Sequence, residues 1–109
     1  MRIHHFYILM SLAARDRHGS AIMRDVLDLT GGEVKLWPAT LYGSLDELID
    51  DGLIREVNAP APDTGQSAGG HRRWFHVTAA GRRVLGHELK AMAELVRRGE
   101  RRLLAREST

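Results

Sequence analysis

Residues 37–54 carry two groups of polar side chains that differ in their chemistry. The first group is small, hydroxylated and uncharged, and the second group is acidic. The groups comprise Ala39, Thr40, Tyr42, Gly43 and Ser44, followed by Asp46, Glu47, Asp50 and Asp51. Hydroxyl groups and the free N–H groups of a helix N-terminus bind phosphate oxygens, whereas carboxylates repel them. A helix over this segment can therefore approach phosphates with its first half while its acidic end points away.

The acidic group also permits a different interpretation, namely general acid–base catalysis. Asp46 and Asp50 are four residues apart, so on a helix they share a face, as general acid–base pairs can. The sequence offers them no nucleophile, glycine-rich phosphate loop or histidine–carboxylate pattern. We therefore expect no catalytic residues and no enzymatic activity, and a small hydrolase is only a remote alternative. The carboxylates are instead expected to form a repulsive rim or to pair with arginines of another element.

The six histidines raise the question of a metal site. His4 and His5 are adjacent, so on a helix their side chains diverge by about 100°. No HxxxH or HxH pair falls on a predicted helix, and the chain has no cysteine. We therefore expect no metal ligands and no cofactor. The lack of cysteine also excludes disulfide bonds and thiolate catalysis.

The composition predicts one compact domain. The chain has 109 residues, 43% of them apolar, which suffices for a modest core. No apolar run reaches the length of a membrane span and the N-terminus lacks a signal-peptide pattern, so a soluble cytoplasmic protein is expected. Residues 1–70 contain 6 Lys or Arg and 10 Asp or Glu, whereas residues 71–109 contain 10 and 4. This asymmetry permits nucleic-acid binding by the basic part, although one long solvated helix would give the same pattern.

Apolar periodicity predicts three helices in the first half of the chain. A first helix is expected from near the N-terminus to about residue 14, and a second over residues 20–29, ended by a pair of glycines. The residues between them, 15–20, are expected to form a polar turn. A third helix with one apolar stripe is predicted by the spacing of Leu41, Leu45, Leu48 and Ile49. Pro38 suits its first position, and Gly52 suits the left-handed residue that ends it. The second and third helices then form a helix–turn–helix element.

Strand-like runs surround and follow the third helix. Residues 34–36 alternate and could form a very short strand, while residues 53–57 and 73–77 are expected to pair around a segment rich in Pro, Gly and Ala. Thr78 suits the N-cap of a fourth helix that extends to about residue 105. This order predicts a mainly α (α+β) fold, a winged helix–turn–helix with a two-stranded wing and a C-terminal helix.

The predicted fourth helix carries an apolar seam with heptad spacing. The seam comprises Leu85, Leu89, Met92 and Val96, and it continues through Gly99 to Leu103. Such a helix is too long for its own small domain to cover. The seam therefore predicts a homodimer.

Four segments of the chain resemble the PadR family of bacterial transcriptional regulators. They are FYILMSLA, HGSAIM, PATLYGSLDELIDDGLI and RRWFHVTAAGRRVL, which together extend over almost the whole chain. The most specific feature is the pattern LY-x-x-L-x-x-L-x-x-x-GLI, joined to an aromatic-x-x-Thr-x-x-Gly pattern after the wing. Family members usually carry Tyr where this chain has Ser20, and a small capping residue where it has Trp37.

The resemblance implies a repressor that binds a palindromic operator as a homodimer, with double-stranded DNA as its partner. Residues 1–78 are then expected to form the DNA-binding domain, and residues 79–109 a dimerisation helix that packs with the first helix, as in the short-tailed subgroup. The expected dimer contacts are Phe6, Leu85, Leu89, Met92, Val96 and Leu103. The alternative is a winged-helix protein–protein interaction module without DNA affinity. The sequence does not identify the operator or a small-molecule effector.

The expected DNA contacts lie on the third helix and the wing. They are Lys35, Pro38, Ala39, Thr40, Tyr42, Gly43, His71, Arg72 and Arg73. The hydroxyls of Thr40 and Tyr42 can serve bases or phosphates, unless Tyr42 packs against the wing and Thr40 is merely solvated. Arg72 and Arg73 face opposite sides of a strand, so only one of them is expected to contact DNA. Charges that protect an exposed strand would give the same pattern.

Trp37 has three possible roles in this scheme. Core packing is the commonest fate of a tryptophan, and it is the role we expect first. Contact with a DNA sugar and lining of an effector pocket at the dimer interface are the alternatives.

Overall fold

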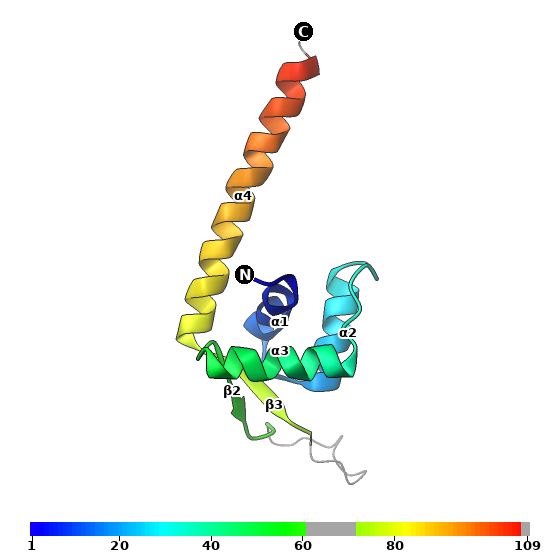
Figure 1. Ribbon diagram of the computed structural model, residues 1–109, viewed down its shortest axis with the longest axis vertical. Coiled ribbons are helices and arrows are strands. Elements are labelled where there is room, and N and C mark those ends of the chain that lie inside the picture. The colour runs from blue at the N-terminus through cyan, green and yellow to red at the C-terminus, as the bar shows by residue number, and fades with distance from the viewer. Residues whose placement is uncertain (61–71, 108–109) are drawn as a thin grey trace.

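The computed structural model describes residues 1–60 and 72–107, and these residues form four helices and three short strands. In chain order they are α1 (Ile3–Ala14), β1 (Arg17–His18), α2 (Gly19–Leu29), α3 (Pro38–Asp50), β2 (Ile54–Val57), β3 (Trp74–Val77) and α4 (Ala79–Glu107). Figure 1 shows α1, α2 and α3 grouped together, with β2 and β3 below α3 and with α4 projecting away from the group. Within the described ranges, no helix is long and apolar enough to cross a membrane.

The core lies where α1 meets the other helices and β3. The apolar stripe predicted for α3 is confirmed, because Leu41, Leu45 and Leu48 are completely buried. They pack in one cluster with the apolar side chains of α1 and α2 and with Phe75 of β3. Since α1 contacts α2, α3, α4 and β3, it fixes the position of each of them.

Glycines end α2 and α3, as the sequence predicts. Gly52 has a φ of 73° and follows α3, and the N–H of Leu53 donates to the carbonyl of Leu48 at 2.9 Å. After α2, Gly32 has a φ of 87°, and its N–H donates to the carbonyl of Leu27 at 2.8 Å. Both turns place a residue in the left-handed region, where a side chain would be strained. These turns set the directions in which the chain leaves the two helices.

The sheet differs from the prediction in two respects. The predicted short strand at residues 34–36 is wrong, because the N–H of Val34 donates to Thr30 Oγ1 at 2.9 Å and no strand is assigned there. Instead, β1 lies within the predicted polar turn and pairs antiparallel with β3, giving the strand order β1-β3-β2. The free edge of β3 offers backbone groups that two extended residues before α2 can satisfy. The predicted pairing of β2 with β3 is confirmed.

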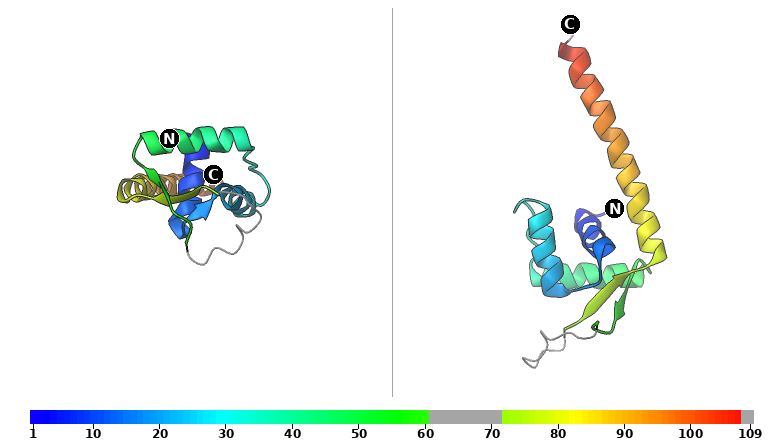
Figure 2. Two further views of the ribbon diagram at one scale, coloured as in Figure 1. Left: turned by 90° about the horizontal axis from the view of Figure 1, so that it is seen from below. Right: turned by 180° about the vertical axis from the view of Figure 1, so that it is seen from behind.

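α4 begins at a tight contact with the turn after α3. The N–H of Gly81 donates to Thr78 Oγ1 at 3.1 Å, which confirms Thr78 as the cap, and Thr78 Oγ1 donates to the carbonyl of Gly52 at 2.7 Å. A Cβ at position 81 would collide with the carbonyl oxygen of Leu53. Leu85 is buried in the core, whereas residues 95–107 are exposed. The right-hand view of Figure 2 also shows this last part of α4 clear of the other elements.

Candidate nucleic-acid interface

The first half of α3 is open to solvent on one side. Pro38, Ala39, Thr40 and Gly43 are exposed, and Tyr42 is half-buried. Pro38 lies at the start of the helix, where its missing N–H costs no hydrogen bond, and the first turn contains no acidic residue. The positive end of the helix dipole therefore has no carboxylate beside it in its own first turn, which favours an approaching phosphate.

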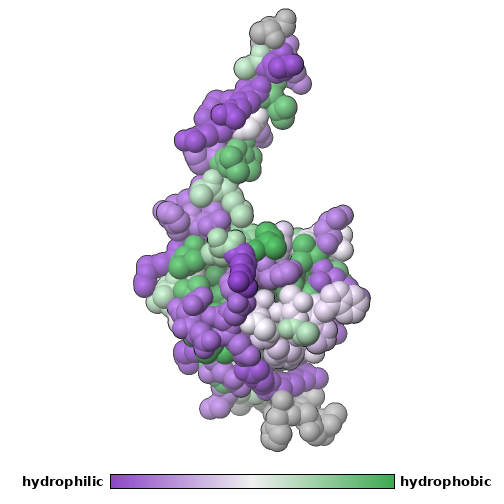
Figure 3. All heavy atoms as spheres, viewed as in Figure 1, coloured by the Kyte–Doolittle hydropathy of each residue, from purple (hydrophilic) through white to green (hydrophobic). Residues whose placement is uncertain are grey.

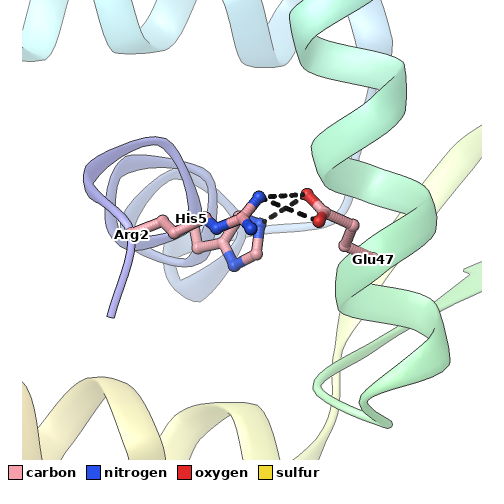
Figure 4. A network of polar contacts seen from close by, with 3 residues as sticks. All are labelled: Arg2, His5 and Glu47. Atoms are coloured by element: carbon pink, nitrogen blue, oxygen red, sulfur yellow. Dashed lines mark hydrogen bonds and ion pairs between the residues drawn. The ribbon is translucent and has the colours of Figure 1, made fainter.

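The acidic half of α3 is tied to neighbouring elements. The Glu47 carboxylate accepts a hydrogen bond from Arg2 Nη1 at 2.9 Å and lies 3.2 Å from His5 Nε2 of α1 (Figure 4). The Asp46 carboxylate lies 3.7 Å from the Arg73 guanidinium. For Glu47 and Asp46, this confirms the expectation that acids of α3 pair with arginines of other elements. The pairs fix α3 on α1 and the wing on α3.

Arg73 is surrounded by side chains of the wing and of α3. Its guanidinium donates to Glu56 Oε1 at 3.0 Å, and this hydrogen bond is the largest cause that raises the pKa of Arg73. The guanidinium carbon also lies 5.2 Å from the ring centroid of Phe75 and 5.7 Å from that of Tyr42. With Asp46 as well, two carboxylates compensate its charge. Arg73 thus holds β2, β3 and α3 together.

Arg72 is exposed and has no carboxylate partner among the described residues. Its Nη1 atom lies 3.2 Å from His18 Nε2. The other ring nitrogen of His18, Nδ1, accepts a hydrogen bond from the N–H of Ala21 at 3.2 Å. A guanidinium carries five N–H donors, and the contact of Arg72 with His18 Nε2 involves only Nη1. The other N–H groups of Arg72 therefore remain available to an anion.

Arg72, Arg73 and Tyr42 border one small polar hollow. Its volume is about 210 Å³, and the first residues of α2, Gly19 and Ser20, lie on its other side together with His18. A Cβ at position 19 would collide with the Tyr42 hydroxyl, so glycine lets the Tyr42 side chain lie close against the first residue of α2. Two guanidinium groups, two hydroxyl groups and a helix N-terminus line this hollow, which we call the anion hollow. Arg72, the hydroxyl groups and the helix N-terminus favour a negatively charged ligand, whereas the charge of Arg73 is compensated by its two carboxylates.

Only some of the residues that the sequence singles out line the anion hollow. Tyr42, Arg72 and Arg73 come together there, whereas Thr40 lies on the adjoining exposed side of α3. His71 lies outside the described residues. His18, Gly19 and Ser20 were not predicted as site residues, because their sequence indicates only a polar turn and the start of an ordinary helix. The signal was present in the N-terminus of that helix, since helix N-termini bind anions.

Trp37 does not pack in the core. Its side chain is 62% exposed, so the expected core packing is wrong. The neighbouring Leu36 is buried instead, because successive side chains of an extended segment point to opposite sides. Lys35 lies on the same outer side as Trp37, and its Nζ is 4.4 Å from the centroid of the indole ring.

The chain is similar to known proteins in its sequence, through a family model, and in its fold. Residues 8–87 match the model of the transcriptional regulator PadR-like family. No curated protein matches the chain. Among solved structures, a PadR family transcription regulator from Clostridium difficile R20291 superposes with a TM-score of 0.72 at 19% identity, covering 94% of this chain and 99% of that one.

Two further solved structures share the fold. A transcriptional regulator from Clostridium thermocellum gives a TM-score of 0.70 at 18% identity and covers 91% of this chain and 87% of its own. Bacillus subtilis PadR in complex with operator DNA gives a TM-score of 0.66 at 20% identity, covering 82% of this chain and 48% of that one. The family match extends over the helix–turn–helix, the wing and the start of α4. The chain therefore belongs to the PadR-like family of transcriptional regulators.

Proposed function

We propose that this protein is a sequence-specific DNA-binding regulator that acts as a homodimeric repressor on a palindromic operator. The observation that carries the proposal is the anion hollow, because it lies beside the uncharged first half of α3. The fold that the chain shares with Bacillus subtilis PadR, whose structure contains operator DNA, supports the same function.

The anion hollow suits a phosphate of the DNA backbone. Arg72 supplies a charge without a carboxylate partner among the described residues, and the Tyr42 hydroxyl and the α2 N-terminus add hydrogen-bond donors. A phosphate bound there would orient α3 in the major groove, where Ala39 and Gly43 would face base edges and Thr40 would bind a further phosphate. Phosphate contacts position a protein on DNA, and base contacts then provide the sequence specificity.

The exposed part of α4 supports the homodimer. Val96 is 58% exposed and Leu103 is 69% exposed, and Leu89 of the predicted seam is also exposed. Figure 3 shows hydrophobic side chains at intervals along the projecting part of α4, beside strongly hydrophilic ones. Phe6 and Leu85 are already buried within the protomer. The predicted seam thus offers a second copy the exposed Leu89, Val96 and Leu103 and the half-buried Met92, and Leu95 and Leu104 are exposed beside it.

The repressor role follows if the operator overlaps the sites that RNA polymerase needs. Transcription in vitro from a template with the selected operator at the promoter should fall when the protein is added. A rise in transcript would instead identify an activator and would leave the DNA-binding proposal intact.

The competing function is a winged-helix protein–protein interaction module. The two functions differ in their salt dependence, because neutralising DNA phosphates releases counterions and makes affinity fall steeply with salt. Arg72→Ala should weaken binding to every duplex and reduce the salt slope by about one unit for each phosphate that a protomer no longer neutralises. Arg83→Ala, which removes an exposed arginine of α4, is the matched control and should leave the slope unchanged. Equal slopes for wild type and Arg72→Ala would exclude the anion hollow as a phosphate site.

A further inference from the structure

Trp37 is unusual among the aromatic residues of this protein. The two Trp, two Tyr and two Phe residues all lie in the described ranges, and only Trp37 is exposed. It occupies the N-cap position of α3, yet its side chain makes no capping hydrogen bond. Its carbonyl oxygen accepts the first helical hydrogen bond, from the N–H of Leu41 at 2.8 Å. The backbone of Trp37 therefore serves the helix, while its indole ring neither caps the helix nor fills the core.

The surroundings of the indole are apolar and positively charged. Trp37 borders a hollow of about 350 Å³ between α2 and the start of α3, next to the apolar side chains of Met23 and Leu27. Arg24 and Lys35 line the same hollow, and no acidic residue of the described ranges does. A surface that joins an aromatic ring to two cations suits a partner that combines apolar rings with negative charge.

The position of Trp37 indicates which partner this is. Trp37 directly precedes the first turn of α3, where Pro38, Ala39 and Thr40 are also exposed, so the indole continues the proposed DNA-binding surface. A DNA strand combines deoxyribose rings and thymine methyl groups with phosphates, which matches the ring and the two cations.

We propose that Trp37 is an additional DNA contact, whose indole packs against a deoxyribose or a thymine methyl group while Lys35 binds the adjoining phosphate. This inference rests on the proposed DNA binding and extends it to the segment before α3. Trp37 stands at a position where a short capping side chain is usual, and its indole makes an apolar contact instead. The affinity that this contact adds does not depend on counterion release.

Salt dependence separates this contact from a phosphate contact. The probe is a fluorescein-labelled duplex selected from a random pool by the wild-type protein. Trp37→Ala should weaken binding about tenfold at each salt concentration and leave the salt slope unchanged. Lys35→Ala should instead reduce the slope by about one unit per protomer. Both variants should keep the wild-type melting temperature, because both side chains are exposed. Wild-type affinity of Trp37→Ala would overturn the inference.

Fluorescence quenching provides an independent measurement. The variant Trp74→Phe leaves Trp37 as the sole tryptophan, and in the free protein acrylamide should quench it almost as well as a free indole. Addition of the selected duplex should then protect it. Strong protection already in the free protein would indicate that Trp37 lies in a contact between protein chains. Quenching that bound duplex does not change would exclude the DNA contact. Either result overturns the inference. If wild-type protein binds no duplex at all, the proposed function fails together with the inference.

Discussion

Arg72 and Arg73 are adjacent in sequence but have different surroundings. Arg73 pairs with Glu56 and Asp46, so its charge is compensated within the protein. Arg72 has no carboxylate partner among the described residues and meets His18 through Nη1, so its other guanidinium donors remain available. The expectation that one of the two arginines contacts DNA remains a prediction, and these contacts favour Arg72 for that role. Arg73 then acts indirectly, by holding the wing against α3.

Hydroxyl deletions in α3 test the predicted division of this helix. Thr40→Ala and Tyr42→Phe remove a hydroxyl group and keep most of the packing. Loss of a hydrogen bond to a phosphate costs about 1.5–3 kcal/mol, so each variant should bind the selected duplex roughly tenfold more weakly or worse. Melting temperatures should barely change, as calorimetry can verify.

Asp50→Asn is the matched substitution in the exposed acidic half. It should leave the affinity unchanged or raise it slightly, because it removes a negative charge from the DNA-binding helix. The reverse ranking, with silent hydroxyl deletions and loss of binding by Asp50→Asn, would assign function to the acidic half and indicate a basic protein partner.

The junction of α3, β2 and α4 controls how the wing and the last helix are placed. Gly81 of α4 lies against the carbonyl of Leu53, so a side chain there forces the two elements apart. Gly81→Ala should lower the free energy of unfolding by about 1–3 kcal/mol, as overpacking does. Gly43→Ala is the control, because a Cβ at that exposed helical position meets nothing within 4 Å. It should stabilise the protein by about 1 kcal/mol in denaturant unfolding. Equal effects of the two substitutions would show that the junction is not tightly packed.

The elements could be predicted from the sequence wherever one periodicity covers many residues. The stripe of α3 and its glycine stop were predicted correctly, because both depend on local geometry. β1 was missed because two residues form no pattern, and they become a strand only where the edge of β3 reaches them. The exposure of Trp37 was missed because hydrophobicity alone predicts burial, whereas Leu36 takes the core position. The anion hollow joins α2, α3 and the wing, so only the fold brings its residues together.

The projecting half of α4 gives the protein an apolar surface that its own domain does not cover. Val96 and Leu103 lie beyond the core of the protomer, so charging them should not disturb its fold. Val96→Lys with Leu103→Lys should therefore convert a dimer into a folded monomer, as measured by light scattering and circular dichroism. A fully dimeric double variant would mean that the interface lies elsewhere on the molecule.

Selection of duplexes from a random pool, followed by footprinting of the recovered site, tests most directly whether the protein is a dimeric, sequence-specific DNA-binding regulator. A homodimer presents two copies of α3 related by a two-fold axis, so the recovered sequences should share an inverted repeat. Its half-sites should lie about one helical turn apart, roughly 34 Å, or a multiple of this spacing, with both half-sites protected together. Recovery of no common sequence, or protection of a single unrepeated half-site at saturating protein, would contradict this function.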